Sequence, residues 1–364
     1  MSGQASTGGM ERDYDAHSEY QRRVVEGGEA ALDGLVGDLD LAALAAGPDG
    51  LTVVDYGAGT GATSVRAMRA AIAAIDRRGG SAAPVAAIHN DVPTSDFSQL
   101  FRTATGSDGY AARATAPVYP MAAAGSFFDR VVPDRTAALG MCSNAAHWLR
   151  EHPEVETPGT MYFAGVAPEA RARLARSAAA DWLAFCTARA AELAAGAGML
   201  VQGISAIEKE GVERASAGLL LEQMWEVAAQ LAAEGSLDAD VLERYVFPVY
   251  CRSAAEATAP FAAGGPLAGE FEVLRASVDE VANPYWELLE ASGDRESYAS
   301  TYTAFVRAFS ESTMRTFLFE PAARGIEPAA LADEFFRRFE AASAADPERG
   351  RYECWILRLA LRRI

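Results

Sequence analysis

The sequence predicts an α/β fold built on a doubly wound, mostly parallel sheet, and three observations support this prediction. Residues 51–56 (LTVVDY) form an apolar, β-branched run that stops at a glycine cluster, and residues 62–78 then space Ala, Met and Ile as a helix does. Further strand-like runs alternate with helical or irregular stretches. The 364 residues, 50% of them hydrophobic, supply enough apolar material for a large core.

The elements are expected in the following order. A polar, helix-compatible stretch at 14–44 precedes the first strand and its helix. Strands are then expected at 84–89, 112–119, 137–142 and 199–204, followed by late strands at 271–278 and 352–361. An amphipathic helix is expected at 219–233, and 296–338 reads as largely helical.

Composition limits the classes of partner and location. Lys and Arg number 32 and Asp and Glu 50, so the net charge is −18, which disfavours nucleic acid and anionic membranes and favours a small molecule. We find no run of about 20 apolar residues and expect no membrane segment. The cysteines are too far apart for a disulfide framework or zinc knuckle, so we expect a cytoplasmic protein; they are Cys142, Cys186, Cys251 and Cys354.

The glycine cluster is the first candidate for chemistry. Residues 55–61 read D-x-G-x-G-x-G between a strand and a helix, where glycine lets the backbone turn sharply and approach a ligand. A dinucleotide site needs G-x-G-x-x-G, whereas this spacing is usual for S-adenosylmethionine (SAM) binding in class I methyltransferases. The alternative is an ordinary strand-to-helix turn.

Two further clusters suit a nucleoside. Asp91 follows the second strand, at the sheet edge where ligands collect, and its carboxylate can accept both ribose hydroxyls, or it can cap the turn before Pro93. Ser126 beside Phe127 suits the edge and face of a purine. The pair at 147–148, His-Trp, is either a pocket wall or core.

The sequence lacks the residues that metal-dependent, hydrolase or kinase chemistry would need. None of the four histidines has a metal-ligand spacing, and neither a G-x-S-x-G elbow nor a G-x-x-x-x-G-K-[ST] loop occurs. Lys209 is the only lysine. Hydrolase and kinase interpretations are therefore disfavoured.

Taken together, five blocks in order resemble the SABATH family, the SAM-dependent carboxyl and N-methyltransferases that act on salicylate, benzoate, jasmonate and caffeine precursors. The blocks are 14–21 (YDAHSEYQ), 55–63 (DYGAGTGAT), 90–97 (NDVPTSDF), 125–133 (GSFFDRVVP) and 143–149 (SNAAHWL). The bias toward Arg and Ala is typical of a high-GC bacterial source. The resemblance implies a class I methyltransferase core with an α-helical cap. It divides the chain into a tail and substrate-gating helix (1–44), a SAM-binding core (45–205), a helical cap (206–270) and late core strands with further cap helices (271–364).

The resemblance also implies the site. Asp91 would hold the ribose, and Ser126 with Phe127 would frame the adenine. The residues implied to bind SAM are Tyr14, Ser18, Asp55, Gly57, Ala58, Gly59, Thr63, Asp91, Val92, Ser126 and Phe127. Gln21 and Trp148 match the pair that bonds the substrate carboxylate, and Asn144 and His147 match substrate-contacting positions, although Asn144 stands where the family usually has Tyr. Val246 replaces the Asn of members with a magnesium site, so no metal is expected, and a homodimer is expected because members are commonly dimers.

The implied reaction fits the scarcity of bases. A carboxylate, with a pKa of about 4 to 5, is already ionised and needs no general base, so direct in-line transfer of the methyl group depends on alignment in a water-poor pocket. The product would be a methyl ester of a small aromatic or apolar acid, and SAM would become S-adenosylhomocysteine (SAH). The alternatives are a heteroaromatic nitrogen or phenol acceptor, or a noncatalytic cofactor-binding protein.

Overall fold

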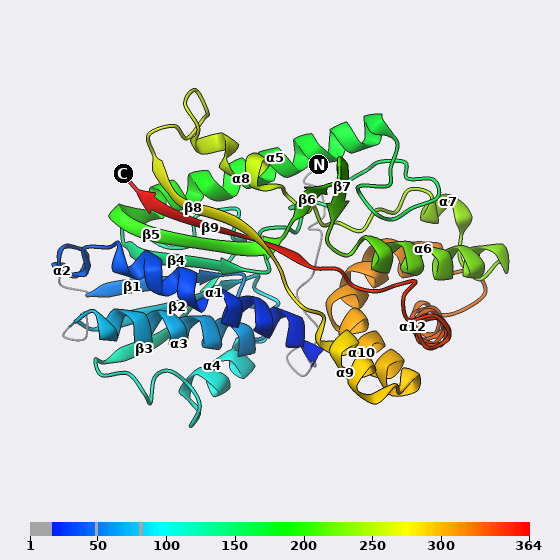
Figure 1. The fold of residues 1–364 in the computed structure, drawn as a ribbon, viewed down its shortest axis with the longest axis horizontal. Helices are drawn as coiled ribbons and strands as arrows, with labels where there is room; N and C mark the ends of the chain where they lie inside the picture. The colour runs from blue at the N-terminus through cyan, green and yellow to red at the C-terminus, as the bar shows by residue number, and fades with distance from the viewer. Residues whose placement is uncertain (1–16, 48–49, 80–82) are drawn as a thin grey trace.

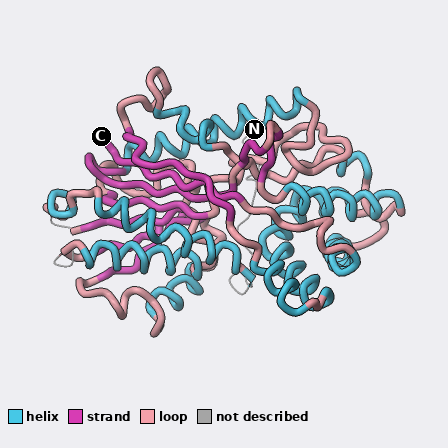
Figure 2. The backbone as a smooth tube through the Cα atoms, in the orientation of Figure 1, coloured by secondary structure: helices cyan, strands magenta, loops and turns pink. Residues whose placement is uncertain are grey.

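The computed structural model describes residues 17–47, 50–79 and 83–364, which form one seven-stranded sheet with helices on both faces and a group of helices beyond one end (Figures 1 and 2). The strand order is β3-β2-β1-β4-β5-β9-β8. Strands β1 to β5 are parallel, and β9 pairs antiparallel with β5 and with β8. The order reverses between β1 and β4, which is the point where open α/β sheets bind ligands.

The strand bounds are β1 Leu51–Tyr56, β2 Val85–Asp91, β3 Val118–Ala124, β4 Ala137–Ser143, β5 Leu193–Ile204, β8 Phe271–Glu280 and β9 Trp355–Arg363. A separate hairpin pairs β6 Ala206–Lys209 with β7 Val212–Ala215.

Helices cover both faces because β1, near the centre of the sheet, is apolar on both sides. Leu51 and Val53 pack into one cluster with α1 (Glu19–Gly37) and α3 (Ala62–Arg77). Val54 and Tyr56, on the opposite face, pack with Trp182 of α5 (Pro168–Glu192). This two-residue alternation is the strand period.

The cap is a third cluster, rich in aromatic residues and formed mainly by helices from the second half of the chain. Its helices are α6 Gly218–Ala233, α9 Pro284–Ser292, α10 Arg295–Met314, the π-helix η4 Arg315–Phe319, α11 Glu320–Ala322 and α12 Pro328–Ala345. Figure 1 shows these helices beyond the end of the sheet, and β9 returning from the cap to lie between β5 and β8. The remaining helices are α2 Leu41–Leu44, α4 Phe97–Thr105, α7 Ala239–Leu242, α8 Ala254–Thr258 and η3 Ala259–Phe261.

The doubly wound, mostly parallel sheet and the helical cap are as the sequence predicts, with differences at element ends. The strand expected at 112–119 lies at Val118–Ala124, because residues 112–117 form turns and coil that end at Pro117. Strand β5 begins at Leu193 rather than 199, across an irregular register that includes Gly196 with φ +81°. The division at 44, 205 and 270 stays a prediction: Phe261 and Leu267, for example, pack against the sheet cluster.

Candidate active site

Two cavities adjoin where the carboxyl ends of the parallel strands meet the cap, and Gln21, Asn144 and Trp148 line both. The first, which we call the core cavity, has an empty volume of about 710 Å³. It is lined by Gln21, Asp55, Gly57, Ala58, Gly59, Thr63, Ser64, Asp91, Val92, Phe127, Ser143, Asn144, Ala145 and Trp148. The second, the cap cavity, has an empty volume of about 640 Å³. It is lined by Tyr20, Gln21, Val24, Asn144, His147, Trp148, Ile204, Ala217, Leu221, Phe247, Val249, Phe305, Phe309, Tyr352, Cys354 and Ile356.

The glycine loop after β1 forms one wall of the core cavity and requires glycine for a geometric reason. Gly57 has φ +85°, and a Cβ there would stand 2.3 Å from the Cβ of Ala145. The amides of Gly57 and Ala58 both donate to the Asn90 carbonyl, at 2.9 and 2.8 Å. The loop is therefore tied to the neighbouring strand, with no room for a side chain at its first glycine.

Asp91 ends β2 and faces the same cavity. Its Oδ2 accepts from the Gly59 amide at 2.6 Å, while Oδ1 accepts from the Val92 amide at 2.7 Å and the Ser95 hydroxyl at 2.6 Å. A carboxylate offers about four acceptor sites, so these bonds orient Asp91 and leave acceptor capacity for a ligand.

Asp55 lies at the end of a buried hydrogen-bonded chain. The Ser64 hydroxyl contacts Asp55 Oδ2 and lies 2.6 Å from His89 Nδ1, and His89 Nε2 lies 2.7 Å from the Tyr110 hydroxyl. Burial raises the pKa of Asp55 to about 7, and burial lowers the pKa of His89 to about 4. A neutral His89 that donates from Nδ1 to Ser64 and accepts from Tyr110 satisfies every proton in this chain.

The other oxygen of Asp55, Oδ1, is buried without a hydrogen-bond partner. A buried acceptor left unpaired costs about 1 to 3 kcal/mol. Because Asp55 lines the core cavity, this oxygen is suited to receive a donor from a bound ligand, and a cationic donor best of all.

The loop that carries Phe127 is anchored by a buried arginine of α5. Arg189, 1% exposed, donates from Nη1 to the Phe127 carbonyl at 2.6 Å and from Nη2 to the Asp129 carbonyl at 2.8 Å. Its Nε donates to Glu192 Oε2 at 2.8 Å. This fork fixes the loop backbone on either side of residue 128.

Glu192, fully buried, completes the anchor. Its Oε1 accepts from the amide of Val131 and, at 3.0 Å, from that of Val132, while Oε2 also accepts from the Tyr56 hydroxyl at 2.8 Å. The pair thus joins strand β1, helix α5 and the loop at 127–132.

The turn after β4 presents Asn144, His147 and Trp148 to the cap cavity. It is held to the segment before α8, because Trp148 forms a β-bridge with Val249 and the Tyr250 amide donates to the His147 carbonyl at 2.9 Å. Burial, together with the charge of Arg252, lowers the pKa of His147 to about 3, so its imidazole is neutral at physiological pH.

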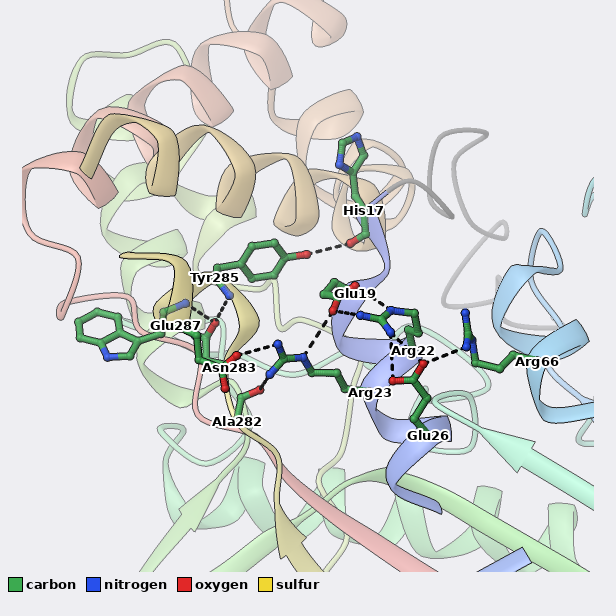
Figure 3. A network of polar contacts seen from close by, with 11 residues as sticks. His17, Glu19, Arg22, Arg23, Glu26, Arg66, Ala282, Asn283, Tyr285 and Glu287 are labelled. Atoms are coloured by element: carbon green, nitrogen blue, oxygen red, sulfur yellow. Dashed lines mark hydrogen bonds and ion pairs between the residues drawn. The ribbon is translucent and has the colours of Figure 1, made fainter. Parts of the chain in front are cut away.

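Helix α1, which carries Gln21, is tied to both the core and the cap by a network of hydrogen bonds and ion pairs (Figure 3). Arg23 pairs with Glu287 of α9 at 2.7 Å, and the Tyr285 hydroxyl donates to the His17 carbonyl at 3.1 Å. On the other side, Glu26 of α1 pairs with Arg66 of α3 at 2.9 Å. Helix α1 therefore places its first turn, with Gln21, at the junction of the two cavities.

The comparison with protein families decides which family the chain belongs to. The family of SAM dependent carboxyl methyltransferases matches over residues 2–364. The chain belongs to this family. As a SAM-dependent carboxyl methyltransferase, it uses SAM as the methyl donor and releases SAH, and the SABATH resemblance is confirmed.

Individual relatives are distant. Indole-3-acetate O-methyltransferase 1 of Arabidopsis thaliana is 26% identical over 231 residues, which are 57% of this methyltransferase and 59% of that enzyme. Gibberellic acid methyltransferase 2 of the same plant is 25% identical over 313 residues, 80% and 76% of the two chains. The solved structure of loganic acid methyltransferase with SAH covers 98% of both chains with a TM-score of 0.78 at 20% identity, which confirms the class I methyltransferase fold.

The core cavity of the methyltransferase fits SAM. Neither cavity has a described Lys or Arg on its wall, whereas Asp55 and Asp91 both line the core cavity. SAM carries a sulfonium, an ammonium and one carboxylate together with ribose hydroxyls; its net positive charge and its N–H and O–H donors suit two protein carboxylates and an unpaired buried oxygen. Within the described part of the chain, no group of three or more His, Cys, Asp or Glu could hold a metal ion, and no helix is long and apolar enough to cross a bilayer.

Most of the residues predicted for the site meet at these cavities. Eleven of them line the core cavity: Gln21, Asp55, Gly57, Ala58, Gly59, Thr63, Asp91, Val92, Phe127, Asn144 and Trp148. His147 lines the cap cavity. Tyr14 lies outside the described residues. Ser18 and Ser126 are not among the described lining residues: Ser18 precedes the first turn of α1, and the Ser126 hydroxyl accepts from the Phe128 amide at 3.3 Å. Their roles stay predictions.

Sequence reasoning missed the buried Ser64–His89–Tyr110 chain and the Arg189–Glu192 anchor. The i, i+3 spacing of Arg and Glu at the end of α5 was the one available signal for the anchor. It also missed most of the cap wall. Residues up to 336 positions apart in the sequence build this wall together, from Tyr20 of α1 to Ile356 of β9.

Proposed function

We propose that the methyltransferase esterifies a small acid whose apolar or aromatic body fills the cap cavity and whose carboxylate lies at the junction of the two cavities, beside SAM in the core cavity. The observation that carries this proposal is the sharing of Gln21, Asn144 and Trp148 by both cavities. A carboxylate at the junction reaches the polar side chains, while its body meets the aromatic wall.

Gln21 and Trp148 are the proposed carboxylate ligands. Both side chains line the two cavities, and Gln21 Oε1 is buried without a hydrogen-bond partner. The proposal assigns the Gln21 amide N–H and the Trp148 indole N–H as donors to the carboxylate. Both are neutral donors, which orient a carboxylate without neutralising it. The charge on the attacking oxygen is thereby kept.

The chain's own contribution to the chemistry is orientation and exclusion of water. SAM supplies a methyl group activated by a positive sulfur. The acid is ionised at neutral pH and no proton has to be removed, which agrees with a cap cavity whose one imidazole is neutral. Aromatic side chains such as Phe247, Phe305 and Phe309 surround the acceptor and keep the site dry.

The test is methyl-ester formation with SAM and a panel of aromatic and apolar acids, detected by mass spectrometry, in wild type, Gln21→Ala and Trp148→Phe. We expect both variants to bind SAH as wild type does in calorimetry while the acceptor KM rises by about tenfold or more, because each loses one charge-assisted bond. Full activity of Gln21→Ala, or methylation of phenols or ring nitrogens in preference to acids, would reject this arrangement.

We also propose a homodimer in the cytoplasm. The dimer is supported by the family resemblance alone, and the location by four cysteines that are all buried and unpaired in the described chain. Light scattering of the purified protein tests the dimer: a single species at 38.5 kDa would reject it.

A further inference from the structure

A buried histidine and a buried tyrosine stand behind Asp55, and neither of them lines the core cavity or the cap cavity. His89 and Tyr110 are 0% and 1% exposed, and a hydrogen bond of 2.7 Å joins Nε2 of the first to the hydroxyl of the second. Their rings also stack, with centroids 5.7 Å apart. An apolar pair would fill the same space without the cost of desolvating these polar atoms, which points to a role beyond packing.

The sheet register brings His89 to Asp55. The two residues are partners in the parallel pairing of β1 with β2, so their side chains leave the same face of the sheet. Ser64 lies in the first turn of α3, and its hydroxyl contacts both Asp55 Oδ2 and, at 2.6 Å, His89 Nδ1. Tyr110, which follows α4, forms the far end of this chain of hydrogen bonds.

The directions of the hydrogens in the chain favour an ionised Asp55. With a carboxylate, Ser64 donates to Asp55 and receives a hydrogen bond from His89 Nδ1–H. The Tyr110 hydroxyl then donates to Nε2, so every hydrogen has an acceptor.

A protonated Asp55 would weaken the chain wherever the proton sits. On Oδ2 it would reverse all three bonds, and the Tyr110 hydrogen would have no acceptor among the described residues. On Oδ1 it would leave the directions unchanged but would make the bond from Ser64 a neutral one, and such bonds are about half as strong as those to a carboxylate. The chain therefore opposes protonation of Asp55.

The surroundings of Asp55 act in the other direction. Burial raises the pKa of Asp55 to about 7, and the charge of Asp91 raises it further, whereas the hydrogen bond from Ser64 lowers it. The charge of Asp55 therefore changes within the physiological pH range, and small contributions from its partners decide how much of it is ionised.

The other groups that face Asp55 from β2, β4 and the segment after α4 stay neutral in this range. Burial lowers the pKa of His89 to about 4. Burial raises the pKa of Cys142 to about 12 and also raises the pKa of Tyr110. A change of charge at Asp55 can therefore be followed without interference from these three groups.

We propose that His89 and Tyr110 are positioning residues for the cofactor. They hold the hydrogen of the Ser64 hydroxyl on Asp55 Oδ2, which keeps Asp55 a carboxylate and leaves its unpaired oxygen, Oδ1, for the ammonium group of SAM. Binding of SAM or SAH then releases a proton from the fraction of Asp55 that is protonated in the ligand-free protein. The proposal concerns the cofactor and does not depend on which acceptor is methylated.

The first experiment counts protons. Calorimetric titration of wild type with SAH, in phosphate and in imidazole buffer, measures the protons released on binding; SAH carries the same ammonium group as SAM and does not react. We expect release of about 0.8 proton at pH 6 and of less than about 0.2 at pH 8, and an SAH affinity that rises about tenfold between these pH values, because the pKa of Asp55 is about 7.

The second experiment assigns this behaviour to the buried pair. Tyr110→Phe removes one oxygen and should weaken SAH binding roughly three- to tenfold at pH 6 but less than about twofold at pH 8, because the midpoint moves up by about 0.5 to 1 pH unit. His89→Leu, which frees the Ser64 hydroxyl to rotate, should shift the midpoint in the same direction. The control is Tyr302→Phe, which removes a buried hydroxyl that donates to the Gly350 carbonyl at 2.7 Å in the cap and should leave the pH profile unchanged.

The pH profile separates positioning from packing. An equal loss of SAH affinity at pH 6 and pH 8 in Tyr110→Phe would mean that the pair only supports the fold, and would overturn the proposal. An SAH affinity in wild type that does not depend on pH, or binding without proton release at pH 6, would overturn it as well. Methyl-ester formation from the acid panel is a separate measurement, so rejection of the proposed acceptor arrangement would leave these results unaffected.

Discussion

Glu192→Gln is expected to lower both stability and cofactor affinity, although the change only replaces one oxygen by NH₂ and Glu192 lines neither cavity. The wild-type carboxylate takes donors on both oxygens: two backbone amides on Oε1, and Arg189 with Tyr56 on Oε2. A glutamine has one acceptor oxygen. If its NH₂ faces the amides, two buried N–H groups lose their acceptor, and Arg189 becomes a buried charge without its counter-ion.

The size of the effect follows from these contacts. Breaking a buried ion pair by removing one partner typically costs about 3 to 5 kcal/mol, a large part of the roughly 5 to 15 kcal/mol that stabilises a folded protein. We therefore expect Glu192→Gln to lose about 4 kcal/mol in urea unfolding. Because Arg189 also holds the Phe127 carbonyl, the cavity wall should loosen and SAH should bind roughly tenfold more weakly in calorimetry.

A matched exposed pair and a double variant test the reasoning. Arg130 and Asp134 pair at 2.7 Å near the same loop, but their side chains are 58% and 60% exposed, so Asp134→Asn should change stability by less than about 0.5 kcal/mol. Adding Arg189→Met to Glu192→Gln should recover part of the loss, since no lone charge then remains. A loss below about 1 kcal/mol for Glu192→Gln, or two single effects that simply add, would refute the argument.

Three other predictions concern the cofactor loop. The folded-state pKa of Asp55, about 7, lies above its ordinary value of 3.8, so its ionisation destabilises the fold progressively as pH rises from about 4 to about 7. Asp55→Asn should therefore abolish SAM binding, yet unfold at a higher urea concentration than wild type at pH 8 and at the same urea concentration near pH 4. An equal gain in stability at both pH values would contradict this. Gly57→Ala should lower stability by about 2 kcal/mol and abolish SAH binding, because its Cβ overlaps Ala145, whereas Gly59→Ala, which meets no atom within 4 Å, should be milder in thermal unfolding. Ser64→Ala should raise the SAM KM with little change in acceptor KM, and Ser64→Thr, which keeps the hydroxyl, should restore it; equal defects in both variants would show that only packing is involved.

The parts of the fold that sequence predicts well are those with strong local patterns. Strand β1 and the start of α3 were placed correctly because an apolar β-branched run, a glycine turn and a helical pattern lie next to one another. Strand β3 was misplaced by several residues, since an edge strand exposes Tyr119 and Met121 and contains Pro120, so neither burial nor residue type marks it.

The residues of the candidate site also differ in how well the sequence predicts them. Residues of the core cavity follow strands directly, and parallel strands bring their carboxyl ends together, so motifs along the sequence suffice to find them. The cap wall is made by tertiary packing: the Tyr20 hydroxyl donates to the Tyr352 carbonyl at 3.1 Å, and Phe305 packs against both rings. No spacing rule in the sequence predicts contacts between residues more than 300 positions apart.

The placement of charge gives the two cavities different tasks. A net charge of −18 cannot draw an acid toward the protein, and no described cation on the cap wall receives its carboxylate. The two carboxylates of the core cavity favour a cation there, and a bound cation next to the junction makes the electrostatic free energy of an arriving anion more favourable. In the proposed arrangement the cap cavity can then stay neutral and apolar, which preserves the reactivity of the carboxylate oxygen. The cavity would become favourable for an acid mainly when the core cavity is filled. An Arg or Lys on the cap wall would bind the acid more tightly in the ground state and would stabilise its charge, which methyl transfer has to remove. In the proposed arrangement, the groups that bind the substrate orient its carboxylate rather than neutralise it.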